Sequence, residues 1–191
     1  NRVTPIDDYP TRLLQTLMSL APIKCENPEP VCVLLTPGPL NSAYYEHSFL
    51  SDQMGIEMVE STDLFVEGKY LYMKTVDGPK RVDVVYRRID DDFLDPLCFN
   101  PQSVIGIPGI MDVYRTGGVN ICSAPGAGIA DDKAIYIYVP DMIKFYLGEQ
   151  PILDNVETWN CEKEQELKYV LDNINELVVK EVDGSGGYGM L

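Results

Sequence analysis

The chain has 191 residues, an ordinary apolar fraction of 45% and a formal net charge of −15. This length can bury a sizeable core in one or two domains, and the acidic charge argues against nonspecific nucleic-acid binding, which needs a basic face. No apolar run is long enough to span a membrane and no basic, cleavable leader is visible, so we expect a soluble, cytoplasmic protein without membrane or nucleic-acid partners.

The cysteines and the single histidine argue against several kinds of metal and catalytic site. The five cysteines form no CxxC pair, which favours single buried thiols over zinc ligation or a disulfide framework. His47 is the only histidine, so a multi-histidine metal site is excluded and a Ser-His-Asp triad is disfavoured. We interpret His47 as a surface or packing residue.

The N-terminal part predicts a helix followed by a buried strand. Leucines recur at helical spacing over residues 9–20, and Pro10 suits a first turn. Residues 31–36 form a short apolar run without alternation, which is typical of a strand buried on both faces of a parallel sheet.

A βαβ unit is the natural continuation. Residues 42–55 predict a helix that Asn41 or Ser42 caps and Gly55 ends. Residues 56–60 predict the next strand, so a Rossmann-like crossover is the expected topology.

The middle of the chain predicts further strands and one short helix. Alternation over residues 64–74 turns around Glu67-Gly68, which indicates a hairpin. Residues 82–88 predict a third core strand, residues 108–117 a short helix and residues 118–124 another strand.

The C-terminal part reads as helix, linker, helix and strand. Residues 130–148 predict one or two short helices interrupted at Pro140, and residues 149–161 are irregular. Residues 162–176 predict an amphipathic helix, and residues 177–182 predict a final strand.

A glycine-rich loop follows that strand. Its residues are Gly184, Ser185, Gly186, Gly187, Tyr188 and Gly189, which formally match GxGxxG. A dinucleotide site would need a helix that begins at the loop. The alternative without a function is a flexible glycine-rich tail. A third reading is a loop between two antiparallel strands whose backbone N–H groups cover nucleotide phosphates. Lys180, one strand-length earlier, could neutralise a phosphate or could be an exposed strand lysine.

Two more charged segments are candidates. Arg87 and Arg88 end a core strand, where ligands of open α/β sheets bind, and alternation means that they cannot both face one ligand. The aspartates that follow could hold a cation, but we favour ion pairs with the arginines or helix capping. Lys133 opens a helix beside a glycine-bearing loop, a position that hints at an anionic partner, while Asp131 or Asp132 caps that helix.

Five long segments together resemble the circularly permuted ATP-grasp proteins, which are related to glutathionylspermidine synthase. They are DDYPTRLLQTL, VLLTPGPLNSAYYEHSFL, VDVVYRRIDDDFLDPL, GIADDKAIYIYVPDMIKFYLGEQPIL and LVVKEVDGSGGYGML, in the family's order and over nearly the whole chain.

The resemblance implies a fold and an activity. The fold is α/β, with a Rossmann-like, mostly parallel sheet flanked by helices over residues 1–150 (the pre-ATP-grasp domain). Residues 151–191 would supply a linker, a helix and the first strand and glycine loop of an ATP-binding lid. The activity is that of an ATP-dependent ligase that joins a carboxylate to an amine through an acyl-phosphate.

The resemblance also implies roles for individual residues. Lys180 would contact ATP phosphate and Gly184 to Gly189 would cover it. Arg87 or Arg88, and the segment around Lys133, would lie near the acceptor or nucleotide. Magnesium ligands are expected outside this chain, so these residues alone would be inactive.

Two other functions stay open at this stage. A decayed, non-catalytic binding module would bind nucleotide without turnover, although the intact Lys180 and glycine loop argue against it. A nicotinamide-dependent oxidoreductase would need a helix after Gly189.

Overall fold

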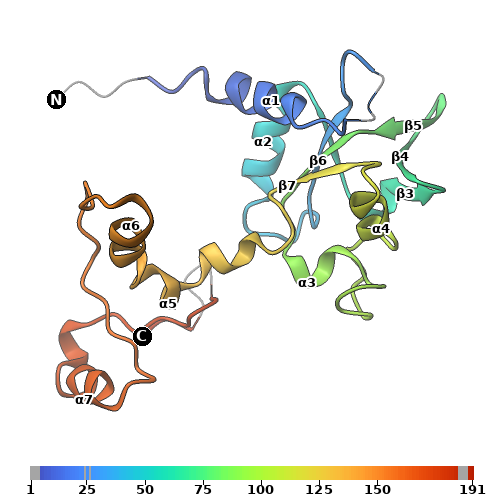
Figure 1. The fold of residues 1–191 in the computed structure, drawn as a ribbon. Coiled ribbons are helices and arrows are strands. Elements are labelled where there is room, and N and C mark those ends of the chain that lie inside the picture. The colour runs from blue at the N-terminus through green and yellow to red at the C-terminus, as the bar shows by residue number, and fades with distance from the viewer. Residues whose placement is uncertain (1–4, 24, 26, 185–188) are drawn as a thin grey trace. The chain divides into compact units, whose positions relative to one another are not determined.

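A computed structural model describes residues 5–23, 25, 27–184 and 189–191 (Figure 1). The chain divides into two compact units, residues 1–126 and residues 127–191, which are described separately below. This packing boundary lies between Gly126 and Ala127, whereas the expected division at residue 150 concerned family domains and stays a prediction.

A four-stranded parallel sheet forms the centre of the first unit, as the sequence predicted. Its strands are β1 (Cys32–Leu35), β2 (Glu57–Val59), β6 (Val84–Arg87) and β7 (Asn120–Cys122), in the order β2-β1-β6-β7. Each neighbouring pair is parallel, with Val33 opposite Val85 and Val85 opposite Ile121. Strand β1 lies inside the sheet and all four of its residues are buried, because strands covered on both faces need side chains that are apolar throughout.

Two helices cover one face of this sheet. Successive strand residues point to opposite faces, so Leu34 of β1 packs with the helices while Val33 and Leu35 join a separate core. The helices are α1 (Tyr9–Ser19) and α2 (Tyr44–Met54), which lie together on one side of the strands in Figure 1. Both helices were predicted at these positions.

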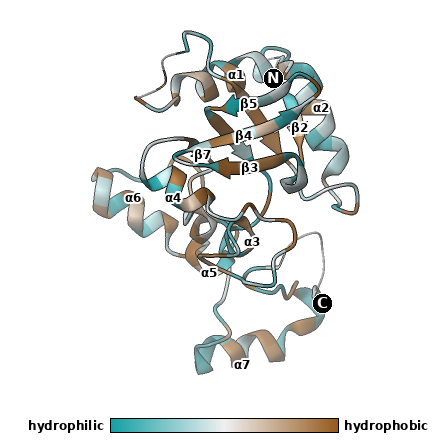
Figure 2. Cartoon of the chain, turned by 90° about the vertical axis from the view of Figure 1, so that its right-hand side faces the viewer, coloured by the Kyte–Doolittle hydropathy of each residue, from teal (hydrophilic) through white to brown (hydrophobic). Residues whose placement is uncertain are grey.

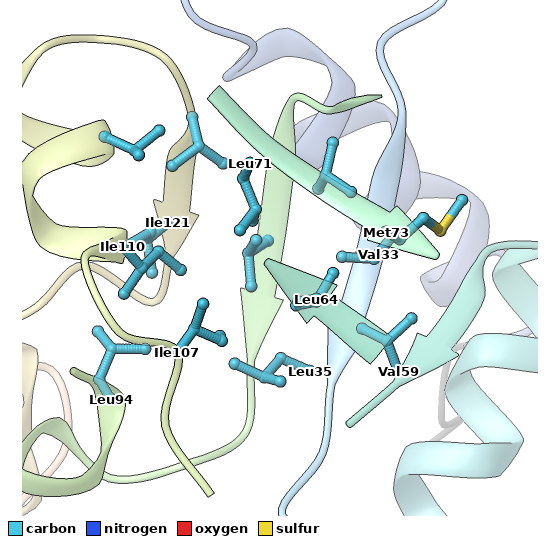
Figure 3. Close-up of a cluster of buried hydrophobic side chains, with 14 of the residues drawn as sticks. Val33, Leu35, Val59, Leu64, Leu71, Met73, Leu94, Ile107, Ile110 and Ile121 are labelled. Atoms are coloured by element: carbon cyan, nitrogen blue, oxygen red, sulfur yellow. The ribbon is translucent and has the colours of Figure 1, made fainter. Parts of the chain in front are cut away.

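An antiparallel sheet, rather than more helices, packs on the other face. It is a meander of β3 (Leu64–Glu67), β4 (Tyr70–Thr75) and β5 (Gly78–Val82). The hairpin turn after Glu67 confirms the sequence prediction, with Glu67 opposite Tyr70. Its apolar residues meet Val33 and Leu35 in the core drawn in Figure 3, to which α4 (Ile110–Arg115) also contributes. The sequence led us to expect helices beside the sheet, and on this face α4 is accompanied by an antiparallel sheet that was not expected there.

The sequence predicted the residue that ends α2 but not the residue that caps its start. Gly55 ends the helix in the left-handed conformation (φ 67°), as predicted. The N-cap residue is Ala43 rather than Asn41 or Ser42. Asn41 instead accepts a hydrogen bond from the Ala43 N–H at 2.9 Å, so its side chain orders the preceding turn.

The second unit contains short helices. They are the 3₁₀ segment Ala127–Asp131, α5 (Lys133–Tyr136), α6 (Val139–Leu147), α7 (Glu164–Asp172) and the 3₁₀ segment Ile174–Glu176; α3 (Asp91–Leu94) and the 3₁₀ segment Ser61–Asp63 belong to the first unit. Pro140 lies in the first turn of α6, so it starts that helix. Brown and teal residues share α7 in Figure 2, in keeping with an amphipathic helix. Among all described residues, no helix is long and apolar enough to cross a bilayer.

The final strand expected at residues 177–182 is not formed. The structure gives those residues no regular strand, and only Val179 exchanges backbone hydrogen bonds with a later residue, Leu191, at 2.9 and 3.0 Å. Two residues that exchange both bonds form the hydrogen-bonded pair of an antiparallel ladder. The segment therefore has one rung of the expected hairpin among its described residues.

Candidate functional site

The carboxyl edge of the parallel sheet collects polar groups from several strands. Strands β1 and β6 are parallel neighbours, and the chain leaves β1 toward β2 on one side while β6 lies on the other. Such a switch in strand order opens the crevice where open α/β sheets bind ligands. Thr36 follows β1, Arg87 is the last residue of β6 and Arg88 follows it, so all three lie at this edge.

Arg87 is buried and fully engaged by the chain around it. Its Nε donates to the Ser123 carbonyl at 2.7 Å, its Nη1 to the Ile89 carbonyl at 2.6 Å and its Nη2 to the Ala124 carbonyl at 3.2 Å. The Nη2 atom also lies 2.7 Å from Asp91 Oδ1. A guanidinium group presents five donors in a fixed plane. One side chain can therefore bind the residues that follow β6 and the residues that follow β7 to the end of β6. These contacts favour a structural role for Arg87.

Arg88 has different partners and is more accessible. Its Nη2 lies 2.8 Å from Glu46 Oε1 and its Nη1 lies 3.3 Å from the Tyr86 hydroxyl. The side chain is 28% exposed, against 6% for Arg87. Since residues 87 and 88 point to opposite faces, as alternation predicted, only Arg88 offers a charged fork that a ligand could reach.

Thr36, just after β1, contacts His47 of α2, an interaction that the sequence did not reveal. His47 Nδ1 lies 2.9 Å from Thr36 Oγ1, and His47 is 1% exposed. Burial lowers the pKa of His47, and the positive charge of Arg88 lowers it further. His47 is thus a packing residue rather than a surface one, and the structure selects one of the two options left open.

Two of the aspartates after β6, Asp91 and Asp95, have structural contacts of the kind favoured from the sequence. Asp91 pairs with Arg87 and accepts a hydrogen bond from Gly126 N–H at 3.1 Å. Asp95 is completely buried and accepts bonds from the N–H groups of Leu97, Gly109 and Met111. Its carboxylate thereby satisfies backbone donors at the start of α4. No group of three or more possible metal ligands clusters in the part of the chain that the structure describes.

In the second unit, Lys133 reaches the base of the glycine loop. Its Nζ donates to the carbonyls of Gly184 and, at 3.3 Å, Val182, while its own N–H donates to Val182 at 3.0 Å. Asp132 caps α5 by accepting hydrogen bonds from the N–H groups of Ala134 at 2.7 Å and Ile135 at 3.2 Å, one of the two capping options predicted. This cap fixes the first turn of α5, which holds Lys133 against the loop.

The ends of the glycine loop are held together, while its middle (Ser185, Gly186, Gly187 and Tyr188) lies outside the described residues. The backbone hydrogen bonds between Val179 and Leu191 join the segment before the loop to the residues after it. Gly189 has φ 64°, a left-handed backbone conformation that favours glycine. Leu191 exchanges both backbone hydrogen bonds with Val179, and this extended pairing counts against the nicotinamide-dependent reading.

Lys180 stands exposed one residue after the rung at Val179. Within the described ranges, no hydrogen bond or ion pair involves its side chain, unlike that of Lys133. The ammonium group is therefore free to meet a ligand. The sequence singled out both lysines but gave no signal that Lys133 contacts a loop about 50 residues later, since such a contact depends on the fold.

Comparison with known proteins identifies longer relatives. An uncharacterized protein of Synechocystis is 57% identical over 189 residues, which is 99% of this chain and 39% of that protein. An uncharacterized protein of Mycobacterium tuberculosis is 51% identical over 191 residues, the whole chain and 34% of its own length. A Frankia alni protein, provisionally named glutamate–cysteine ligase 2-3, is 42% identical over 95% of the chain and 21% of its own length.

The chain thus spans between about a fifth and two fifths of these relatives. A family model described as a circularly permuted ATP-grasp matches residues 1–191, the entire chain. The chain belongs to the circularly permuted ATP-grasp family.

Proposed function

We propose that this chain is part of an ATP-dependent carboxylate–amine ligase that works through an acyl-phosphate. The observation that carries the proposal is the contact of Lys133 Nζ with the base of the glycine loop, at Val182 and Gly184. A lysine and a glycine loop are the two features expected of a site for phosphates, and here they meet within one compact unit. Family membership makes ATP the appropriate nucleotide.

The loop and its lysines would act together on the phosphates. Backbone N–H groups of residues Gly184 to Gly189 would donate to phosphate oxygens, where a missing Cβ permits close approach. Lys180 would neutralise phosphate charge with its free ammonium group. Lys133 would exchange its two carbonyl partners for phosphate oxygens, because a charged acceptor binds an ammonium group more strongly than a neutral carbonyl. Residues 151–191 would thus begin the ATP-binding lid, and Mg²⁺ would be held by residues outside this chain.

The carboxyl edge of the first unit would bind substrate. Residues 1–150 would form the pre-ATP-grasp domain, and Arg88 is the residue best placed there to bind a carboxylate, since its planar fork is accessible at the switch in strand order. Arg87 would support that edge from below through its carbonyl contacts.

The substrates proposed are a carboxylate and an amine of amino-acid type. The provisional name of the Frankia relative specifies glutamate and cysteine, which carry these two groups. It supports this substrate class without identifying the pair.

The test is turnover by the full-length protein. Wild-type protein with Mg²⁺ and ATP should form ADP and phosphate only when both an amino-acid carboxylate and an amine are present, and the panel of substrates should include L-glutamate with L-cysteine. Lys180→Ala should lower kcat/KM by about 100-fold, the usual cost of removing one preorganised charge-stabilising donor. Lys168→Ala, an exposed lysine on α7, is the matched control and should retain activity.

Three other results are informative. Residues 1–191 alone should show no turnover. ATP binding without ADP formation by the full-length protein would favour a non-catalytic nucleotide-binding module. Absence of ATP binding, together with no effect of Lys180→Ala, would reject both functions.

A further inference from the structure

The amino edge of the parallel sheet carries a cavity that the proposed ligase chemistry does not use. The cavity has a volume of about 360 Å³ and is lined by Asn27, Val31, Lys80, Arg81 and Asp83. Val31 and Asp83 immediately precede β1 and β6, so the cavity lies at the end of these strands opposite to Arg87 and Arg88.

Three interactions hold the charged groups of this cavity in place. The Arg81 guanidinium lies over the Tyr70 ring at 4.1 Å from its centroid, in a cation–π arrangement. Arg81 Nε lies 3.1 Å from Asp83 Oδ1, and Asp83 Oδ2 accepts a hydrogen bond from Val31 N–H at 3.0 Å. Asp83 is 3% exposed, so the pair is anchored by the protein rather than by solvent.

The same groups have unused hydrogen-bonding capacity. Arg81 Nε, Arg81 Nη2 and Asp83 Oδ1 are buried atoms with no hydrogen-bond partner among the described residues. The 3.1 Å approach between Arg81 and Asp83 is therefore an ion pair without hydrogen-bond geometry. Arg81 Nε and Asp83 Oδ1 at least face each other as an ion pair, which leaves Arg81 Nη2 as the buried donor without any polar partner in the described part of the chain. Buried donors without partners are rare in folded proteins because each one costs free energy, so Nη2 calls for an acceptor from a binding partner.

We infer that this cavity binds a small oxyanion, a carboxylate or a phosphate, beside Arg81. The unpaired Nη2 would donate to one oxygen of the anion, and the exposed Lys80 ammonium could reach another. Lys80, Arg81 and Asp83 together carry one net positive charge, which favours an anion over a cation. The stacking on Tyr70 holds the guanidinium plane in one orientation, so little side-chain freedom is lost on binding.

The test is an anion titration of the full chain followed by NMR of the arginine Nε–Hε groups, at constant ionic strength. Inorganic phosphate and acetate are the two probes. The Arg81 signal should shift saturably with at least one of them, while the signal of Arg115, an exposed arginine elsewhere in the first unit, should not. A response to phosphate alone, to acetate alone or to both would support the site and identify which oxyanion it prefers.

Variants test whether the cavity residues cause the binding. Lys80→Met should weaken binding about two- to fivefold, as expected for an exposed charge, and Arg81→Met should weaken it about tenfold or more. Arg115→Met is the matched control and should bind as the wild type does. If Arg81→Met fails to fold, Lys80→Met and the wild-type titration still decide the question. Absence of a saturable Arg81 shift with either probe, or unchanged affinity in both cavity variants, would overturn the inference.

Discussion

His47 shows how burial and a neighbouring charge together set the charge of a single residue. The imidazole is buried against Thr36, with Nδ1 and Oγ1 2.9 Å apart. Desolvation lowers its pKa in the folded protein, and Arg88 adds a like-charge effect. The unfolded chain leaves the imidazole in water with an ordinary pKa of about 6.5. His47 is therefore neutral in the folded protein at neutral pH.

This difference predicts that acidification destabilises the fold through His47. Because the folded-state pKa is the lower one, the unfolded chain binds the proton more readily. The contribution of neutral His47 is complete above about pH 6.5 and is lost as the pH falls below that value. Urea unfolding at about pH 7.5 and about pH 5.5 should show a smaller loss of unfolding free energy in His47→Gln than in the wild type. An equal loss in both proteins would contradict the buried, neutral assignment.

At the scale of the element, the end of β6 separates two adjacent arginines into different tasks. Arg87 points inward and fastens carbonyls of two segments, whereas Arg88 points to the other face and stays partly open to solvent. Strand alternation predicted that they diverge, but not which one would be buried. That choice depends on the loop after β7, which lies 36 and 37 residues further along the chain at Ser123 and Ala124.

Conservative lysine substitutions should therefore have unequal effects. Arg87→Lys should lower the free energy of unfolding by about 3 kcal/mol, because one ammonium group cannot satisfy the carbonyls and Asp91 together. Arg88→Lys should stay within about 1 kcal/mol of the wild type, since its pair with Glu46 is partly exposed to solvent. Urea denaturation of the two variants in parallel measures the difference. Equal destabilisation would argue against the division of roles.

At the scale of the whole molecule, local patterns predicted what local forces determine. The sequence predicted buried strands at residues 31–36 and 82–88, because strands covered on both faces need apolar residues throughout. The alternation of apolar residues predicted the hairpin after Glu67. The packing of β3 to β5 on the sheet was not visible, because it depends on contacts between distant strands. Residues 177–182 carry a strand-like pattern but find only one rung at Val179 among the described residues.

The residues of the candidate site could be predicted from the sequence, but not the contacts between them. The glycines, Lys180 and Lys133 could each be singled out from residue type and position. Their meeting could not, because the Lys133–Gly184 contact joins segments that are brought together only by the fold.

The two units differ in how much apolar surface they bury. Apart from Val170, every fully buried hydrophobic residue among those described belongs to the first unit. Residues such as Phe145, Tyr146 and Ile152 are instead strongly exposed. Since burial of apolar surface is the main stabilising contribution, the second unit should be the less stable one.

Hydrogen exchange of residues 1–191 tests this expectation. Amides of β1 and β6 should exchange at the rate of global unfolding, whereas those of α6 and α7 should exchange far faster through local opening. Equal protection in both units would contradict the assignment of stability to the first unit.

The proposed ligase activity requires Lys133, Lys180 and the glycine loop to form one ATP-phosphate site. Its most direct test is calorimetric measurement of ATP affinity in the full-length protein, with Lys133→Met, Lys180→Met and the control Lys168→Met. Each of the first two variants should raise the Kd for ATP about tenfold or more, as expected when a charge-assisted contact is lost, while the control should leave it unchanged. ATP affinity that is the same in all four proteins would contradict it.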